Sequence, residues 1–300
     1  MKKLQANQAV IVKGVAGQYS LHRYEPYFSG IAVARGIFRK DKIIPLPGDL
    51  VEYSASGDPD IPFVIENILP RKNELKRPPM ANLDILLITV STGLPEPDFY
   101  LIDRMAAYAN ILNITPYILL TKTDIDDSNV SEILDNYRPA GFPIYQLGFE
   151  NEMELQRLKN DIRGEIVAFA GQSGVGKSTY LNLLFGNSLM ETGELSHKAG
   201  RGKQTTRHIE LFPTGISYVA DTPGFQTLNL AETEITGTQF AAGYPEINRL
   251  SENCRFNNCT HLHEPGCAVI EAGSDQINPK RLKRYQFLRS ELDSFYQNMY

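Results

Sequence analysis

The stretch at residues 171–178 constrains the fold of this 300-residue chain more than any other. It reads GQSGVGKS and matches G-x-x-x-x-G-K-S, a pattern whose glycines let backbone N–H groups surround phosphate oxygens. The apolar run 166–170 before it predicts a strand buried on both faces. Residues 179–186 after it predict a helix that ends at a glycine. A helix N-terminus behind a glycine-rich turn favours bound phosphate, so we predict a nucleoside triphosphate site rather than a chance turn.

Two side chains of this stretch have specific expected roles. Lys177 would reach the β- and γ-phosphates, and the Ser178 hydroxyl would bind Mg²⁺. The residues of this segment that we predict to bind nucleotide are Gly171, Gln172, Ser173, Gly174, Val175, Gly176, Lys177, Ser178 and Thr179.

A second motif, T-K-T-D at residues 121–124, follows the apolar run 117–120. It resembles the guanine-reading [N/T]-K-x-D motif of GTPases. The Asp124 carboxylate would accept hydrogen bonds from guanine N1–H and N2–H₂, which adenine cannot supply, and Lys122 would lie over the base plane. The short motif also occurs by chance in solvated loops, but ligands bind at the carboxyl ends of parallel strands. We therefore predict that Thr121, Lys122 and Asp124 bind guanine.

A third motif, D-T-P-G at residues 221–224, follows the apolar run 216–220. Asp221 matches the aspartate that holds Mg²⁺ through water, and the Gly224 N–H would meet the γ-phosphate. The glycine-rich, basic segment 200–208 predicts a switch loop, although an inconsequential surface turn is the alternative. Either Thr205 or Thr206 in it would complete the Mg²⁺ shell. The residues expected to act in catalysis are Lys177, Thr205, Thr206 and Gly224.

The order of these motifs differs from that of Ras-like GTPases. There the phosphate-binding loop comes first and the guanine motif late, whereas here residues 121–124 precede residues 171–178. A strand–helix sheet can be cut at one loop and rejoined at its termini without changing the packed product, because termini lie at the surface. The chain therefore predicts a circularly permuted GTPase domain. Its switch region would continue directly into the C-terminal part of the chain.

The sequence outside these motifs divides into three regions. Short β-type runs at 9–12, 31–34, 49–53 and 63–65 predict a small β-barrel of the OB or SH3-like kind. Residues 71–79 are polar, end in a double proline and predict a linker. From 83 to 170, strand and helix patterns alternate, which is typical of a doubly wound, mostly parallel sheet.

Two basic segments lie outside the nucleotide motifs. Arg35, Arg39, Lys40 and Lys42 cluster around one predicted hairpin and indicate either an RNA-contacting face or an ordinary charged loop. Residues 279–289 predict an amphipathic helix with a basic start, which either touches RNA or docks on the protein surface.

The three cysteines follow the spacing Cys254-x₄-Cys259-x-His261-x₅-Cys267. Three thiolates and an imidazole suit a closed, tetrahedral and structural Zn²⁺ site. His263 is the competing imidazole, and buried reduced cysteines without metal are the alternative. An odd, clustered set of cysteines favours metal ligation in a reducing compartment over disulfides.

Composition excludes only broad classes. At 42% hydrophobic and 22% charged residues, the chain is that of an ordinary globular protein. It contains neither an apolar run of about 18 residues nor the apolar stretch of a secretory signal. The net charge is −5, yet residues 1–80 carry 12 Lys and Arg against 8 Asp and Glu. This asymmetry fits a local nucleic-acid contact and fits a solvated surface almost as well.

Taken together, the sequence resembles the ribosome-small-subunit-dependent GTPase A (RsgA/YjeQ) family over essentially its whole length. Besides the motifs above, the resemblance is carried by the segments 34–40, 47–51, 71–78, 221–225 and 261–267. The family pattern also favours His261 over His263 as the zinc ligand.

The resemblance implies a multidomain α/β fold. We expect an OB-fold at residues 1–70, a circularly permuted GTPase domain at 71–229 and a zinc-binding helical domain at 230–300. It further implies a cytoplasmic, monomeric enzyme that hydrolyses GTP to GDP and phosphate in late assembly of the small (30S) ribosomal subunit. Its cofactors would be Mg²⁺ and one structural Zn²⁺, its partners the 30S subunit and 16S rRNA, with no membrane. A GTP-regulated RNA-binding module with little turnover, or a GTPase that serves tRNA or the large subunit, is the alternative.

Three positions depart from common GTPase patterns. Thr121 stands where many GTPases have Asn, which removes an amide that buttresses the phosphate-binding loop. Gln204 stands where the family often has His. Phe225 stands where Ras-like enzymes place the glutamine that orients water, and a phenyl ring cannot do so by hydrogen bonding, so we expect slow intrinsic hydrolysis.

Overall fold

The structure is a computed structural model that describes residues 4–40, 43–76, 78–148, 151–185, 209–215, 217–220 and 230–297. Its contacts group the chain into two compact units. The first unit takes Met1–Ile85, Gln156–Phe169 and Ser178–Gly224, and the second takes Leu86–Leu155, Ala170–Lys177 and Phe225–Tyr300. The domain boundaries expected from the sequence remain a prediction.

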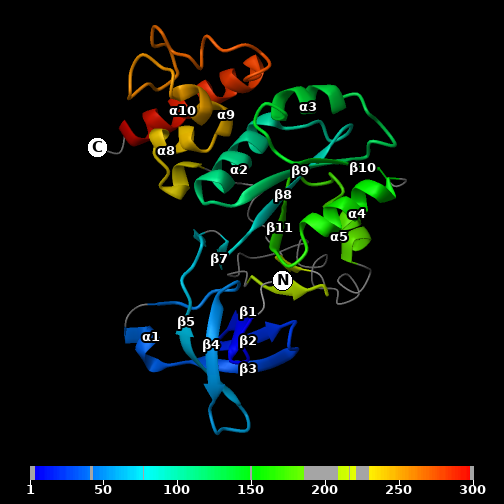
Figure 1. Ribbon diagram of the computed structural model, residues 1–300, viewed down its shortest axis with the longest axis vertical. Coiled ribbons are helices and arrows are strands. Elements are labelled where there is room, and N and C mark those ends of the chain that lie inside the picture. The colour runs from blue at the N-terminus through cyan, green and yellow to red at the C-terminus, as the bar shows by residue number, and fades with distance from the viewer. Residues whose placement is uncertain are drawn as a thin grey trace, which may run out of the picture. The chain divides into compact units, whose positions relative to one another are not determined.

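A closed five-stranded barrel opens the first unit, drawn in blue in Figure 1. Its strands are β1 (Gln8–Val15), β2 (Gln18–Arg23), β3 (Phe28–Ala34), β4 (Leu50–Ala55) and β5 (Phe63–Ile68), with helix α1 (Gly36–Lys40) after β3. They close in the order β1-β2-β3-β5-β4, with β3 and β5 parallel and the other pairs antiparallel. A small β-barrel is what the sequence predicts. Its core includes the fully buried side chains Ile11, Val51 and Ile65.

The segment predicted to be a linker instead contains a short hairpin, so that prediction was wrong in part. Strands β6 (Glu74–Lys76) and β7 (Pro79–Ala81) pair antiparallel. Leu75 and Met80 are fully buried, and this burial holds a segment whose other residues are mostly polar. Gly48 has φ +93°, and a Cβ there would lie 1.9 Å from the Ala81 carbonyl oxygen. Only glycine fits where the loop before β4 meets β7.

A six-stranded sheet has the order β10-β9-β8-β11-β13-β12. Its strands are β8 (Ile85–Ser91), β9 (Thr115–Thr121), β10 (Ile144–Leu147), β11 (Ile166–Ala170), β12 (Leu211–Pro213) and β13 (Tyr218–Ala220). The pairs β9–β10 and β11–β13 are parallel, whereas β12 runs antiparallel to β13. Every residue of β8 and β11 is buried, as expected for parallel strands covered on both faces.

Helices lie between these strands, as the alternating pattern of the sequence predicts. They are α2 (Phe99–Ile111), α3 (Val130–Tyr137), α4 (Glu152–Asp161) and α5 (Lys177–Phe185). Asp98 caps α2, because its carboxylate accepts a hydrogen bond from the Leu101 N–H at 3.0 Å. Between α4 and β11 the chain turns at residues 162–165, where Gly164 has φ +83°.

The C-terminal part is helical, with η2 (Leu230–Thr233), α8 (Gly237–Ala242), α9 (Pro245–Ser251) and α10 (Pro279–Gln297). Helices α8, α9 and α10 gather beside α2 in the second unit (Figure 1). Buried ion pairs join α10 to α2: Arg281 contacts Asp103, and Arg284 Nε lies 2.6 Å from Asp103 Oδ2. The basic start of α10 is therefore directed largely into the protein, as a docked helix requires.

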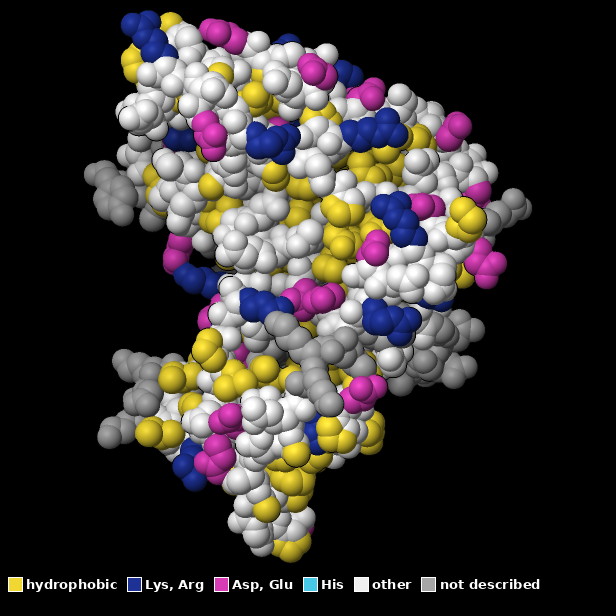
Figure 2. Space-filling view, viewed as in Figure 1, with side chains coloured by type: hydrophobic (Ala, Val, Ile, Leu, Met, Phe, Trp, Pro, Cys, Tyr) yellow, Lys and Arg dark blue, Asp and Glu magenta, His cyan; other side chains and the backbone are white. Residues whose placement is uncertain are grey.

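The surface carries charges of both signs, and the helices are those of a chain without a membrane-spanning helix in its described ranges. Figure 2 shows Lys and Arg interspersed with Asp and Glu over the visible face, without a broad region of one sign among the residues it colours. Of the helices in the described ranges, none is both long and apolar enough to cross a membrane.

Candidate nucleotide site and metal cluster

The phosphate-binding loop joins β11 to α5, as the sequence predicts. Helix α5 begins at Lys177, so Lys177 and Ser178 occupy its first turn. Lys177 Nζ donates to the carbonyl oxygens of Gly171 at 2.9 Å and Gln172 at 2.5 Å. Burial lowers the pKa of the Lys177 amine. The amine thus lies inside the loop, where a phosphate oxygen would replace these carbonyl contacts.

Gly171 meets a backbone that leaves no space for a side chain. Its φ is +134°, and a Cβ there would lie 2.2 Å from the Thr89 carbonyl oxygen of β8. The first glycine of the motif is therefore required both by its backbone conformation and by this close approach.

The guanine motif lies against the phosphate-binding loop. Thr121 is fully buried, and its Oγ1 donates to the Val175 carbonyl oxygen at 2.6 Å. Lys122 Nζ donates to the Gly174 carbonyl oxygen at 2.9 Å. The hydroxyl of Thr121 thereby makes the buttressing contact that the sequence analysis expected to be lost with the Asn amide. Two motifs about fifty residues apart along the chain form one site.

Further contacts fix the segments around this site. Thr92, just after β8, donates from its Oγ1 to the Thr121 carbonyl oxygen at 3.0 Å. The Asp98 N–H donates to Gln172 Oε1 at 3.3 Å, so the start of α2 touches the phosphate-binding loop. Asp124 is exposed, and its carboxylate is thus accessible to a base.

Sequence reasoning missed Gly148, the residue after β10. A Cβ there would lie 3.1 Å from Thr123 Oγ1 and 3.4 Å from Asp124 Cβ. Its backbone therefore lines the site beside the guanine motif. The available signal was topological, since the carboxyl ends of β9 and β10 must meet at one edge of the sheet.

Several predicted site residues lie outside the described ranges. They are Thr205, Thr206, Asp221 and Gly224, together with Gln204 and Phe225. Their roles remain predictions. The described site residues all belong to the phosphate-binding loop, the start of α5 and the guanine motif.

The cysteine cluster forms as predicted in the second unit. One ligand atom from each of Cys254, Cys259, His261 and Cys267 lies within 4.8 Å of the others. Cys254 Sγ lies 3.9 Å from Cys267 Sγ, and His261 Nδ1 lies 3.4 and 3.7 Å from the Cys267 and Cys254 sulfurs. A tetrahedral zinc with bonds of about 2.3 Å to sulfur and 2.0 Å to nitrogen requires sulfur–sulfur distances of about 3.8 Å and sulfur–nitrogen distances of about 3.5 Å. The donor set and its spacing therefore fit Zn²⁺.

Protons compete with a cation for the sulfur atoms of this cluster. Burial raises the pKa of the Cys259 thiol to about 12 and lowers the pKa of His261. The imidazole is then neutral and able to ligate, whereas the Cys259 thiol must give up its proton to a bound cation before it can ligate. His261 is buried, but His263 is exposed and lies outside the cluster.

Glu264 organises the loop that carries the ligands. Its carboxylate accepts hydrogen bonds from the Thr260 N–H at 2.6 Å, the Leu262 N–H at 3.0 Å and the His263 N–H at 3.2 Å, and from the Thr260 hydroxyl. Burial opposes ionisation, but these hydrogen bonds outweigh it and lower the pKa of Glu264 to about 2. The sequence analysis did not single out this residue.

Comparison with known proteins agrees with this architecture. The sequence model of the family described as RsgA GTPase matches residues 68–231. The small ribosomal subunit biogenesis GTPase RsgA of Ruminiclostridium cellulolyticum is 41% identical over 279 residues, which cover 92% of this chain and 90% of the relative. The protein of the same name from Caldanaerobacter subterraneus is 40% identical over 274 residues, covering 90% of each chain.

Two solved structures share the fold. YloQ, described as a circularly permuted GTPase, aligns with a TM-score of 0.79 at 30% identity, covering 98% of this chain and 97% of its own. YjeQ from Thermotoga maritima gives 0.79 at 28% identity, covering 95% and 98%. The expected fold, with its barrel and permuted GTPase, is thereby confirmed. Given the family match over residues 68–231 and the 41% identity over most of its length, this chain belongs to the RsgA GTPase family.

Proposed function

We propose that this protein hydrolyses GTP to GDP and phosphate in the late assembly of the small ribosomal subunit, which stimulates the reaction. The observation that carries the proposal is the contact of Thr121 and Lys122 with the phosphate-binding loop. This contact unites a base-reading motif and a triphosphate cradle in one site. The names of the relatives, which refer to small-subunit biogenesis, support the choice of partner.

Each residue of the site has a stated task in this proposal. Lys177 binds the β- and γ-phosphate oxygens, the N–H groups of the loop surround them, and Asp124 binds the guanine edge. A Mg²⁺ held by Ser178, and through water by Asp221, would neutralise charge on the β- and γ-phosphates. Thr205 or Thr206 would complete that shell, and Gly224 would donate its N–H to the γ-phosphate.

The slow step is the positioning of the attacking water. Phe225 follows the D-T-P-G motif and offers no hydrogen-bonding group, so the chain alone orients water poorly. A group supplied by the partner can complete such a site and raise turnover by several orders of magnitude. Stimulation by the ribosomal subunit follows from this deficiency.

The remaining parts of the proposal concern binding. We assign the barrel and the cysteine cluster to contact with 16S rRNA, the cluster with one structural Zn²⁺. The hairpin predicted around the basic residues was wrong, because helix α1 (Gly36–Lys40) follows β3 there. Of these residues, Arg35 pairs with Glu66 at 2.7 Å yet keeps 59% of its side chain exposed, so RNA phosphates can still reach it. We further propose that the protein is a monomer and that it acts in the cytoplasm, where ribosomal particles are assembled.

Turnover of GTP by the purified protein tests the proposal, alone and with isolated 30S, 50S or 70S particles. We expect slow turnover alone and strong stimulation by 30S particles only. The Lys177→Ala variant should lose triphosphate binding and all turnover. Fast turnover alone, or stimulation by 50S particles instead, would overturn the partner assignment. Nucleotide binding without turnover under any condition would identify a GTP-regulated binding module.

A further inference from the structure

The hairpin of β12 and β13 occupies a sensitive place in the chain. It lies between the segment 200–208, predicted to be a switch loop, and the D-T-P-G motif at 221–224. Any shift of the hairpin along its axis would therefore be passed through the backbone to both segments. Within the first unit, the barrel contacts this hairpin directly.

Tyr24, just after barrel strand β2, holds the turn of the hairpin. Its hydroxyl donates to the Ser217 carbonyl oxygen at 2.7 Å and accepts from the N–H groups of Thr214 at 2.8 Å and Gly215 at 3.2 Å. One donor and two acceptor positions are the full capacity of a phenol hydroxyl. Burial raises the pKa of Tyr24, so the phenol keeps its proton and its donor near neutral pH. A single side chain thus binds three backbone groups of one turn.

Two further contacts join the barrel to the strands of the hairpin. His22 Nδ1 lies 3.0 Å from the Tyr218 hydroxyl, and the two rings meet edge to face. Lys13 in β1 pairs with Glu210 at 2.6 Å, and the same two residues form an antiparallel bridge. Glu210 directly precedes β12, and Tyr218 lies three positions before Asp221 in the sequence. The contacts therefore bind the hairpin at its beginning, its turn and its second strand.

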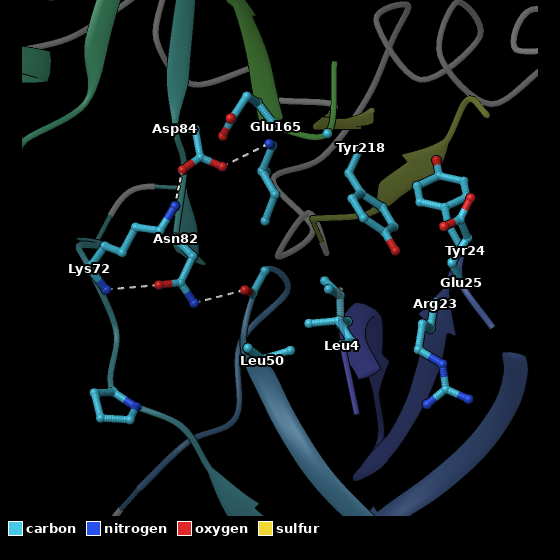
Figure 3. Close-up of a pocket in the computed structure, with 15 residues that line it drawn as sticks. Leu4, Arg23, Tyr24, Glu25, Leu50, Lys72, Asn82, Asp84, Glu165 and Tyr218 are labelled. Carbon is cyan, nitrogen blue, oxygen red and sulfur yellow. Dashed lines mark hydrogen bonds and ion pairs between the residues drawn. The ribbon is translucent and has the colours of Figure 1, made fainter. Parts of the chain in front are cut away.

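A cavity of about 520 Å³ lies beside these contacts. Figure 3 shows Tyr24 and Tyr218 side by side at one side of it, with Lys72, Asn82 and Asp84 opposite. Because this space is not filled by packed side chains, the barrel is attached to the hairpin through the polar contacts above and the packing of the Tyr24 ring against Tyr218, whose ring centroids lie 4.9 Å apart. A dense apolar interface would spread the same attachment over many residues.

From these contacts we propose that Tyr24 is a positioning residue, through which the barrel fixes the β12–β13 hairpin and couples it to the nucleotide state. The proposal rests on the proposed function in that residues 200–208 and 221–224 respond to nucleotide. Coupling is reciprocal. A partner that moves the barrel would then alter the switch segments, and the nucleotide would alter the barrel.

Amide hydrogen exchange of the full chain tests the coupling without any ribosome. Exchange is compared with GDP and with a non-hydrolysable GTP analogue in the wild type, Tyr24→Phe and Tyr27→Phe. Tyr27 is the matched control, because the residue is 74% exposed and lies three positions from Tyr24. In the wild type and in Tyr27→Phe, we expect exchange in β2 to differ at least about threefold between the two nucleotides. In Tyr24→Phe that difference should vanish, while the Thr214 and Gly215 amides exchange at least about tenfold faster.

Other results would overturn the proposal. One is that the exchange rates in β2 of the wild type are the same with GDP and with the GTP analogue. The other is that the difference between the two nucleotides remains as large in Tyr24→Phe as in the wild type. If Tyr24→Phe increases exchange throughout the barrel with both nucleotides, the Tyr218→Phe variant provides the test. It removes the hydroxyl that contacts His22 from the hairpin side, and we expect it to reduce the nucleotide-dependent difference in β2 exchange.

GTP turnover separates this inference from the proposed function. With 30S particles, the ratio of stimulated to unstimulated turnover should fall about fivefold or more in Tyr24→Phe but not in Tyr27→Phe. Full stimulation of Tyr24→Phe would overturn the inference. A wild type that shows no stimulation contradicts the proposed function alone, and the exchange difference then still decides whether Tyr24 couples barrel and hairpin.

Discussion

At the scale of single residues, the hydroxyl of Thr121 shows that a contact can be kept when its usual residue is replaced. Its Oγ1 donates to the Val175 carbonyl oxygen from a fully buried position. The sequence identified Thr121 as part of the guanine motif, because the motif is recognised from its residue types and its position after a strand. It did not reveal the bond to Val175, which depends on how closely β9 approaches the phosphate-binding loop.

Replacing Thr121 tests this bond. Thr121→Val keeps the shape of the side chain but leaves a buried carbonyl oxygen without this donor, which costs about 1–3 kcal/mol. We expect GTP affinity to fall about tenfold, measured by titration calorimetry. Thr121→Ser retains the hydroxyl and should stay close to the wild type. Equal affinities for the Val and Ser variants would show that the hydrogen bond does not support the loop.

Asp124 provides a second test at this scale. Asp124→Asn replaces one acceptor by an amide donor, which suits the carbonyl group that xanthine carries where guanine has an amine. Loss of a hydrogen-bonded partner in a polar site lowers affinity strongly, so we expect GTP binding to weaken about 100-fold or more and XTP to be preferred. Competition between the two nucleotides measures this preference. Unchanged selectivity for GTP would remove Asp124 from the guanine site.

At the scale of elements, helix α2 connects the nucleotide site to the C-terminal helices. Its first residues touch the phosphate-binding loop through Asp98 and Gln172, and its Asp103 binds Arg281 and Arg284 of α10. The Tyr137 hydroxyl also donates to Asp103 at 2.9 Å. The alternation of strand and helix patterns predicted a helix in this part of the chain. It could not predict that the arginines of α10 point inward, since their partner lies about 180 residues away in the chain.

Removing the charge of Asp103 tests its buried ion pairs with Arg281 and Arg284. In Asp103→Asn, two buried guanidinium groups lose their shared carboxylate, and breaking such a pair costs about 3–5 kcal/mol. Urea unfolding should show this loss. Glu132→Gln is the control, because its partner Lys280 is 71% exposed and such a pair contributes at most about 1 kcal/mol. Similar losses for both variants would contradict a special role for the buried cluster.

The cysteine cluster offers a matched pair of histidines. His261→Ala removes a proposed zinc ligand, whereas His263→Ala removes an exposed imidazole two residues away. We expect metal analysis of the purified chains to find about one zinc in the His263 variant and far less in the His261 variant. The reverse result would exchange the two assignments. The sequence left this choice to the family pattern, and burial now favours His261.

At the scale of the whole molecule, motif order predicted the permuted sheet before any geometry was known. Strands rich in apolar residues, such as β8 and β11, were found because burial on both faces leaves a continuous apolar run. Strand β2 (QYSLHR) was missed because its alternation is weak, and the β6–β7 hairpin was missed because prolines and charges hide Leu75 and Met80.

Ligand binding should stabilise the part of the molecule that holds the site. At a GDP concentration of about 100 times its dissociation constant, mass action adds about 2.7 kcal/mol to the free energy of unfolding. Urea unfolding with and without GDP measures this gain, and Lys177→Ala should abolish it. A wild-type midpoint that does not change with GDP would contradict nucleotide binding by the folded chain.

The turn at residues 162–165 lies where the two ends of a conventional GTPase domain would meet, and it sets the order in which the site is synthesised. A ribosome translating this chain releases the barrel and the base-reading half first, and the phosphate-binding half only later. No nucleotide can be bound until residues near 178 have left the exit tunnel. Nucleotide therefore cannot assist the folding of the first half of the chain during its synthesis, and it can stabilise the fold only after β11 and the start of α5 have been made.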